Sequence, residues 1–501
     1  MLPAYRIPLL TMLATVMGLA AGELVLGTHA FFAAMMAVTL TCIGLTYNVL
    51  GGLSTLSGIT FAVCTLRWVV ISQFAKVILG QPADSNLVDP SLTATVYAVF
   101  FGCLLPGSFF YARMRLKLPK PAEPETTAQS GLFYAIALAG GLTGEVLFNL
   151  YTVTYGKGEQ SETQLNGYHS AGVALQALLL LALVIAVDSR LRKTGGRHSF
   201  GTAAFVPWMA GMLGGFINTE RAEMLAPTLL YFATCYFRGY RFRLRHYVAG
   251  VSGILLFIVF ISPLELFSRD AVRDLEFRDR VYAAFHLLAT VDWAEVRAAS
   301  ERESAAGGAS YEDYYGVSGV DVLNRVSRIR MDSNLIAACA NYHYGFTTIN
   351  NDLLSAVPHF LLKQKPQRSS ADFVGRVSGV SGDIVGNTEP AFTMVSDSFG
   401  AFGWLGVIVT SLIILPVVFM VYESMFDMSR PWGTVALVTC AQGFPESGLS
   451  GLIAYFLLRL PIYLLLASYA VHLAAKWVPM QGDDGQPLSD DSPGHAAATS
   501  A

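Results

Sequence analysis

The apolar run TMVSDSFGAFGWLGVIVTSLIILPVVFMV, residues 393–421, carries one ionisable side chain, that of Asp397, near its start. A run of about 20 apolar residues is long enough to cross the hydrocarbon core of a membrane as a helix. About eleven further runs of this kind occur, so we expect an all-α polytopic membrane protein with about 12 transmembrane helices. The other expected spans are residues 7–27, 31–50, 54–79, 92–111, 132–154, 168–188, 201–219, 222–238, 247–267, 432–446 and 450–473.

The composition agrees with this interpretation. Hydrophobic residues make up 53% of the chain and charged residues 14%, values that exclude disorder and disfavour an ordinary soluble globule. Of the 6 cysteines, only Cys339 lies outside the expected spans, so no external disulfide framework is expected. No metal-ligand spacing occurs, and we expect neither a metal nor another cofactor.

Lys and Arg residues gather in alternate connectors, which predicts the orientation of the chain. Positive charge stays on the cytoplasmic side of a membrane, so we place both termini inside and residues 268–392 outside. The charged connectors follow the fourth, sixth and eighth spans, with Arg113, Arg115, Lys117 and Lys120 in the first, Arg190, Arg192, Lys193 and Arg197 in the second, and Arg238, Arg241, Arg243 and Arg245 in the third.

Residues 268–392 form the one long interruption between spans. Apolar residues recur at helical spacing over 281–291 and again over 320–329, so we expect a mainly helical loop domain that caps a cleft between spans. The expected organisation is transmembrane helices 1–9 over residues 1–267, the loop domain, helices 10–12 over 393–478, and a disordered cytoplasmic tail over 479–501.

Three ionisable residues lie well inside expected spans: Arg67, Glu145 and Arg459. Such residues are costly in a membrane and usually face the bundle interior or a wet cavity. They are expected either to fix helix packing through an Arg–carboxylate pair or to line a polar cleft for a charged lipid head group. At the outer face, Glu220 and Arg221 lie in the tight turn between two spans, and Arg221 suits either a lipid phosphate or an anion facing the outer segment.

Several patterns are missing from the sequence. It has no phosphate-binding loop, no nucleotide-binding glycine pattern, no Asp-x-Asp pair and no Gly-x-Ser-x-Gly elbow. The cytoplasmic connectors are too short to hold a catalytic domain. Any enzymatic activity is therefore expected outside, without a nucleotide or nucleic-acid partner, on a substrate supplied by a membrane carrier.

Three local patterns resemble the Wzy-type O-antigen and exopolysaccharide repeat-unit polymerases of bacterial inner membranes, in the O-antigen polymerase and ligase superfamily. The first is FINTERA, residues 216–222, which opens a span that ends in the basic RGYR, residues 238–241. The second is NRV, residues 324–326, followed by VPHF at 357–360 and Lys365-Pro, with His359 where that family often has Arg. The third is DSFGAFGWLG, residues 397–406, which leads into the tenth span.

The resemblance implies a GT-C-like, metal-independent glycosyltransferase at the periplasmic face of the bacterial inner membrane. Such an enzyme joins polyprenyl-diphosphate-linked oligosaccharide repeat units into a surface polysaccharide or exopolysaccharide. Its implied partners are this lipid-linked substrate, membrane lipid, a flippase and a chain-length regulator. Without a metal, Arg and Lys must stabilise the leaving diphosphate. The candidate catalytic residues are Arg221, Glu220, His359 and Asp397, and the candidate substrate-binding residues are Arg325, Arg328, Lys365, Arg67 and Arg459.

Other functions stay open. An O-antigen ligase would share the architecture, and a catalytic His343 or His359 in the loop domain would favour it. A transporter of polysaccharide or lipid-linked oligosaccharide would suit the buried Arg67, Glu145 and Arg459, although transporters usually show internal repeats that are not evident here. A scaffold subunit of an export machine is a further alternative.

Overall fold

The computed structural model describes residues 5–115, 130–151, 167–218, 221–256, 264, 275, 277–290, 292–294, 296, 314–315, 321–357, 370–379, 392–428 and 430–477. Within these ranges the regular elements are all helices. Six helical runs are long and apolar enough to cross a membrane: Ala30–Leu50, Leu56–Ile78, Pro90–Arg115, Gly131–Phe148, Met394–Met425 and Leu449–Tyr469. The all-α prediction is confirmed, and the described chain has the helices that a membrane protein needs.

The expected number of about 12 spans stays a prediction. Two further apolar helices, Leu9–Val25 and Thr202–Ile217, are shorter than the six. Over the expected spans 222–238 and 432–446 the helices are Arg221–Phe237 and Pro431–Gly443, of 17 and 13 residues. The last of these rises only about 20 Å, less than the hydrocarbon core of about 30 Å.

The helices of the first half are α1 (Leu9–Val25), α2 (Ala30–Leu50), α3 (Leu56–Thr65), the π-helix η2 (Leu66–Val70), α4 (Ile71–Ile78), α5 (Pro90–Arg115), α6 (Ser130–Tyr151), α7 (Gly167–Lys193), α8 (Thr202–Ile217), α9 (Arg221–Phe237) and α10 (Leu244–Leu256). A 3₁₀ turn, η1 (Gly52–Ser54), precedes α3.

The second half contains α12 (Phe277–Thr290), α14 (Asp321–Val326), α15 (Ile329–Ala338), α16 (Thr347–Ala356), α17 (Ser370–Val377), α18 (Met394–Val409), the π-helix η4 (Thr410–Ile414), α19 (Leu415–Met425), α20 (Pro431–Gly443), the 3₁₀ turn η5 (Phe444–Glu446), α21 (Leu449–Gly451), the π-helix η6 (Leu452–Arg459) and α22 (Leu460–Trp477).

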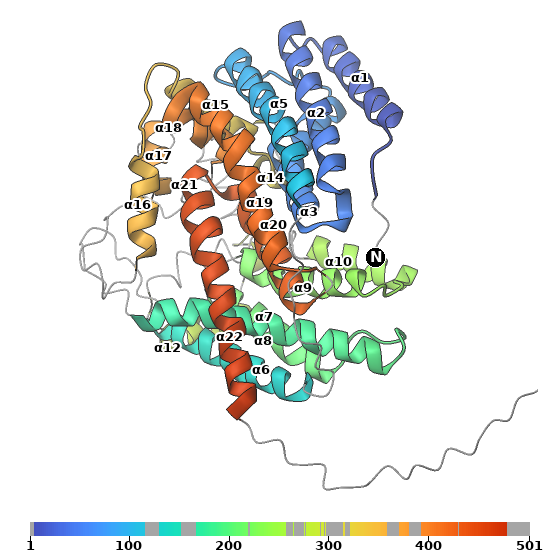
Figure 1. Ribbon diagram of the computed structural model, residues 1–501, viewed down its shortest axis with the longest axis vertical. Coiled ribbons are helices and arrows are strands. Elements are labelled where there is room, and N and C mark those ends of the chain that lie inside the picture. Colours follow the sequence, from blue (N-terminus) through green and yellow to red (C-terminus); the bar gives the residue numbers. More distant parts are fainter. Residues whose placement is uncertain are drawn as a thin grey trace, which may run out of the picture.

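The helices run in two main directions. In Figure 1, α1, α2, α5, α19 and α22 run up and down the view, and α5 packs against α2, α18 and α19. A cluster of buried aromatic rings fills this bundle, formed by Phe61, Trp68, Tyr97, Phe100 and Phe101. The helices α6, α7 and α8 run across the view below it (Figure 1), so the predicted spans do not share one direction.

Glycines allow α6 and α7 to pack closely. A Cβ atom at Gly144 would lie 2.7 Å from the backbone nitrogen of Gln176 in α7, so only glycine fits at this contact. Close packing through small residues is typical of helix pairs in membranes. The pair is therefore held by backbone proximity rather than by large side chains.

The described parts of the predicted loop domain contain helices joined by turns and irregular segments, and these helices contact different parts of the chain. Helix α12 packs against α8, whereas α14 packs against α4, α15 against α5 and α18, and α16 against α21 and η6. The apolar stripe expected over 320–329 is not carried by a single helix: α14 ends at Val326 and α15 begins at Ile329. The helix breaks there because the N–H of Arg328 donates to the carbonyl of Arg67, 3.2 Å away, instead of continuing a helical ladder.

Tyr314 fixes another part of this segment to α4 and to the connector between α4 and α5. Its hydroxyl donates to the carbonyl of Ala83, and its ring lies 4.4 Å from the buried Nζ of Lys76. The Lys76 ammonium in turn donates to the Ser85 hydroxyl at 2.7 Å. This contact combines a cation–π interaction with hydrogen bonds, and it holds residue 314 against α4 and the connector after it.

The run 393–421 is not one uninterrupted helix. Phe402 and Gly403 have non-helical backbone angles, and Gly403 has a φ of 61°, which favours glycine. The carbonyls of Gly400 and Ala401 accept hydrogen bonds from the N–H groups of Tyr344 and Gly345, at 3.1 and 2.9 Å. Backbone groups freed by the break are thus satisfied by the segment between α15 and α16, as membrane burial requires.

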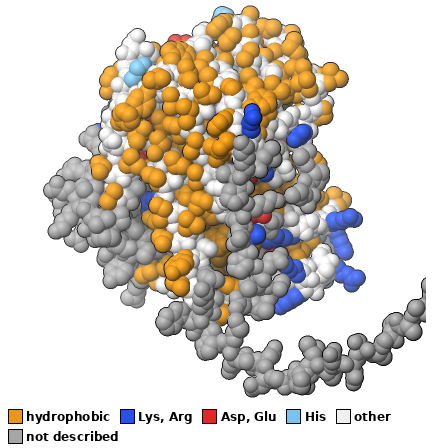
Figure 2. All heavy atoms as spheres, in the orientation of Figure 1, with side chains coloured by type: hydrophobic (Ala, Val, Ile, Leu, Met, Phe, Trp, Pro, Cys, Tyr) orange, Lys and Arg blue, Asp and Glu red, His pale blue; other side chains and the backbone are white. Residues whose placement is uncertain are grey.

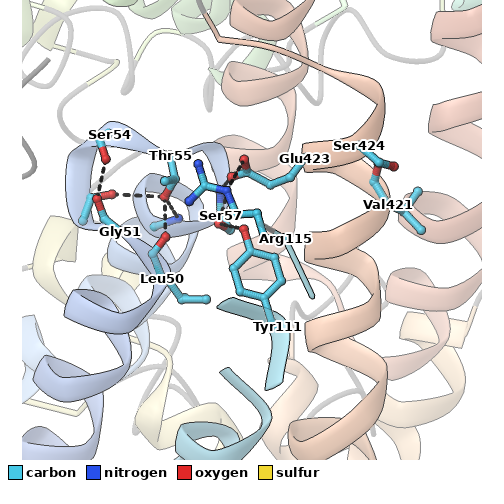
Figure 3. A network of polar contacts seen from close by, with 12 residues as sticks. Leu50, Gly51, Ser54, Thr55, Ser57, Tyr111, Arg115, Val421, Glu423 and Ser424 are labelled. Carbon is cyan, nitrogen blue, oxygen red and sulfur yellow. Dashed lines mark hydrogen bonds and ion pairs between the residues drawn. The ribbon is translucent and has the colours of Figure 1, made fainter. Parts of the chain in front are cut away.

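At the opposite end of the bundle, α19 is tied to the start of α3. Figure 3 shows the carboxylate of Glu423 between Arg115 and Ser57. One oxygen accepts from the Ser57 hydroxyl and N–H, at 2.9 and 3.1 Å, and the other lies 3.3 Å from Arg115 Nε. The Ser57 hydroxyl also contacts the Tyr111 hydroxyl at 2.8 Å. A carboxylate at a helix N-terminus is electrostatically favourable, and this contact joins three helices.

The surface is strongly apolar over the helices that run up and down the view in Figure 1. Figure 2 shows hydrophobic side chains across most of its upper part, with Lys and Arg gathered toward the lower right. Leu10, Val25 and Ile78 are more than four-fifths exposed, at 82%, 86% and 82%. Large apolar surfaces of this extent are unusual on soluble monomers and fit contact with lipid chains.

Candidate functional site

Two arginines that are far apart in the sequence converge on one carboxylate. Arg67, in η2, forms an ion pair with Oε1 of Glu446 through its Nη2 atom. Arg328, between α14 and α15, binds the same oxygen through its own Nη2 at 2.6 Å. The three residues, which we call the arginine pair and its counter-ion, come from a spanning helix, the predicted outer segment and the turn after α20.

Local irregularities in all three segments build this arrangement. Arg67 belongs to a π-helical stretch, a kind of bulge that often occurs at functional sites. Arg328 occupies the break between two short helices. Glu446 ends the 3₁₀ turn η5, whose Pro445 carbonyl accepts a 2.8 Å hydrogen bond from the Trp68 indole. Each residue is therefore placed by a departure from regular helix that neighbouring contacts stabilise.

The arginine pair carries one more positive charge than its counter-ion neutralises. In the described part of the chain, Nε of Arg67 and Nε of Arg328 are buried and have no hydrogen-bond partner. The side chain of Glu446 is 43% exposed, against 22% for Arg67 and 10% for Arg328. The carboxylate thus lies on the accessible side of two partly unsatisfied guanidinium groups, an arrangement suited to an anionic ligand.

Arg67 belongs to an apolar helix, and Glu446 to the turn after one. Arg67 is near the middle of the helical run Leu56–Ile78, and the 13 residues of α20 that lead to η5 rise about 20 Å. Charged groups inside apolar helical runs usually face a wet cavity or pair with each other. Arg67 has a carboxylate partner, as one of the two sequence interpretations required, but that partner is Glu446 and not Glu145, which accepts from Gln176 at 3.2 Å.

Asp397 lies behind this turn and is buried, with 2% exposure. Its Oδ1 accepts from the Tyr344 hydroxyl, and its Oδ2 accepts from the backbone N–H of Ser450 at 3.4 Å. It therefore caps the N-terminal end of the helical run that begins at Leu449, where a carboxylate is favoured. This placement supports a positioning role for Asp397 rather than contact with a substrate.

A glycine makes this cap possible. A Cβ atom at Gly448 would collide with the Asp397 carboxylate. We therefore expect Gly448→Ala to destabilise the protein by about 1–3 kcal/mol, because the capping carboxylate or the turn must move. Thermal unfolding of the full chain in detergent micelles measures this as a lower melting temperature.

The matched control is Gly451→Ala, three residues further on. The closest heavy atom to a Cβ there is 3.4 Å away, and the position is helical, so this change should be neutral or stabilising. A Gly448→Ala protein as stable as the Gly451→Ala protein would contradict the capping role of Asp397.

A second buried carboxylate, Asp332 in α15, joins the outer segment to the bundle. It accepts hydrogen bonds from the hydroxyls of Tyr97, Thr393 and Ser396 and from the N–H of Thr393. Burial raises the pKa of Asp332, while the hydrogen bonds from Ser396, Thr393 and Tyr97 act in the opposite direction. Through these four hydrogen bonds Asp332 connects α15 to α5 and to the start of α18.

The other predicted site residues lie elsewhere or outside the described chain. Arg459 ends η6 and donates to the Tyr463 hydroxyl at 2.9 Å, with its guanidinium 5.1 Å from that ring. Glu220, His359 and Lys365 lie outside the described residues. Arg221 begins α9 and Arg325 lies in α14, but their side chains are not described, so the roles expected of them stay predictions.

Glu446 was missed in the sequence. It closes the expected span 432–446, where a terminal carboxylate looks like an ordinary membrane-interface residue. The available signal was the sequence around it, PESG at residues 445–448, because a Pro and a Gly between two apolar runs indicate a turn. His343, considered for a ligase, packs its ring against Phe399 and lies beside the break at Gly403.

Comparisons with known proteins give no family assignment. No protein-family model, no curated protein and no solved structure matches this chain. Among the described residues, no group of three His, Cys, Asp or Glu side chains lies close enough to hold a metal ion.

Proposed function

We propose that this protein polymerises polyprenyl-diphosphate-linked oligosaccharide repeat units at the periplasmic face of the bacterial inner membrane. The observation that carries the proposal is the convergence of Arg67 and Arg328 on Glu446, between a spanning helix and the predicted outer segment. The same position would allow a lipid-linked diphosphate to reach both guanidinium groups from the membrane.

The chemistry of the proposed reaction requires such groups. An acceptor hydroxyl oxygen forms a bond to the anomeric carbon of the donor sugar, and the bond from that carbon to the diphosphate oxygen breaks. The hydroxyl proton passes to a base, and the electron pair of the broken bond stays on the diphosphate. Arg67 and Arg328 would stabilise the negative charge that develops there, since a guanidinium fork matches phosphate oxygens.

The base of this reaction is proposed among Glu220 and His359, which lie outside the described residues. Asp397 is less suited, because both of its carboxylate oxygens accept hydrogen bonds from the protein and its exposure is 2%. Burial without contact to the arginine pair favours a supporting role, in which Asp397 fixes the turn that carries Glu446.

Deletion of the gene tests the proposal. Cells without the protein should still move single lipid-linked repeat units to the outer leaflet and should accumulate them there unpolymerised. The measurement is the leaflet and the chain length of the accumulated intermediate. Accumulation on the cytoplasmic side would instead indicate a transporter, and long chains on the outer carrier would indicate a ligase.

A further inference from the structure

We infer that Glu446 is a displaceable internal counter-ion, which occupies the anion site of Arg67 and Arg328 until a diphosphate group takes its place. This inference rests on the proposed function for the identity of the ligand, a diphosphate. The contacts of the three side chains carry the rest.

The first argument is that the guanidinium groups of Arg67 and Arg328 have N–H donors without an acceptor in the part of the chain that the structure describes. Both guanidinium groups donate to a single oxygen, Oε1 of Glu446, through one Nη2 atom each. Their Nε atoms have no partner in the described chain although they are buried. One carboxylate therefore leaves donor capacity unused, and a diphosphate, with more oxygens and more charge, would use it better.

The second argument is access. Glu446 is the most exposed of the three side chains, at 43%, and the guanidinium groups lie deeper, with Arg328 at 10%. A ligand that approaches the arginine pair therefore meets the carboxylate first. Because like charges repel, the ligand must displace Glu446 or bind more weakly in its presence.

The third argument is that neighbouring residues hold the backbone around Glu446, whereas, among the described residues, the hydrogen bonds of its carboxylate go to the two arginines alone. The Pro445 carbonyl accepts from Trp68, the Ser447 hydroxyl donates to the Gly443 carbonyl at 2.8 Å, and Gly448 packs against the carboxylate of Asp397. These contacts hold both flanks of the turn. Displacement then needs only rotation of the Glu446 side chain about its own bonds, with no movement of a helix.

A structural alternative makes the opposite prediction. If Glu446 served only to orient the two arginines, its removal would leave them disordered and would weaken anion binding. If Glu446 competes with the ligand, removing its charge strengthens anion binding. The sign of the change therefore separates the two roles.

The test is binding of inorganic pyrophosphate to the purified full chain in detergent micelles, with wild type, Glu446→Gln and the charge-matched control Asp427→Asn. Asp427 lies at the other end of α20, so its variant has the same net charge without touching the arginine pair. We expect Glu446→Gln to bind about tenfold more tightly than wild type, equivalent to about 1.4 kcal/mol. Asp427→Asn should bind as wild type does.

A second probe, polyprenyl diphosphate in the same micelles, identifies the source of the diphosphate. Tighter binding of both probes supports a site for the diphosphate group itself, and tighter binding of the lipid alone supports a site for the lipid-linked form. Unchanged or weaker binding of both probes by Glu446→Gln overturns the inference. Should Glu446→Gln fail to fold, Glu446→Asp keeps the charge but shortens its reach, and it should show a smaller gain of the same sign.

The outcome is independent of the cellular test of function. A tenfold gain in pyrophosphate binding together with normal polymerisation in deletion cells would keep the counter-ion and reject the polymerase. Loss of polymer in deletion cells with no gain in pyrophosphate binding would keep the polymerase and reject the counter-ion.

Discussion

Replacement of Arg328 by Gln should reduce polymer formation by about 100-fold or more, which is the cost of removing one donor that stabilises transition-state charge in other enzymes. Arg328 is the deeper of the two arginines, with 10% exposure, and it contacts Glu446 at 2.6 Å. Its backbone N–H, which holds the segment against Arg67, is unaffected by the change. Polymer yield and chain length, measured in deletion cells that express the variant, are the readout.

Three further variants show whether the loss of polymer in Arg328→Gln cells comes from the loss of the guanidinium group at this site. Arg328→Lys keeps the charge but loses the planar fork, so it should recover only part of the activity. Arg67→Gln should resemble Arg328→Gln because both groups bind the same carboxylate. Arg192→Gln is the control, since Arg192 is 59% exposed in an i,i+4 pair of a kind that contributes little. Normal polymer from Arg328→Gln cells with equal protein levels would remove the arginine pair from the mechanism.

Both arginines were candidates from the sequence, but the sequence did not predict that they bind the same carboxylate. Arg67 stood out as a charge inside an apolar run, and Arg328 as a neighbour of the NRV pattern. Hydropathy and spacing place residues along a helix but carry no information on which distant turn a side chain meets. Glu446, the carboxylate that binds both arginines, is the last residue of an apolar run. A charge at that position is common and does not by itself indicate a site.

The sequence predicts the all-α class of the fold, but it does not predict the breaks within and between the helices. Long apolar runs specify helices because the backbone must satisfy its own hydrogen bonds in lipid. The breaks at Phe402–Gly403 and before Ile329 were missed because apolar spacing continues across them. Both are held by backbone hydrogen bonds to distant segments, from Tyr344 and Gly345 in one case and to Arg67 in the other. Likewise, hydropathy gives the length of α6–α8 but not their direction (Figure 1).

Asp332→Ala should cause the largest loss of stability among the single changes considered. Asp332 is fully buried and accepts from Tyr97, Ser396 and both donors of Thr393. Removing the carboxylate leaves these donors buried without their acceptor, at about 1–3 kcal/mol for each one that finds no substitute. We expect a net loss of about 3–5 kcal/mol and a melting temperature in detergent lower by about 5 °C or more.

The effect should reach the arginine pair through a defined route. Asp332 holds α15 against α5 and α18, and Arg328 immediately precedes α15, so loosening this junction moves Arg328 away from Glu446. Asp332→Ala protein should therefore also bind pyrophosphate more weakly than wild type. The control is Arg192→Gln, whose side chain is 59% exposed, and it should unfold at nearly the wild-type temperature. Equal melting temperatures for the two variants would show that Asp332 does not hold the outer segment to the bundle.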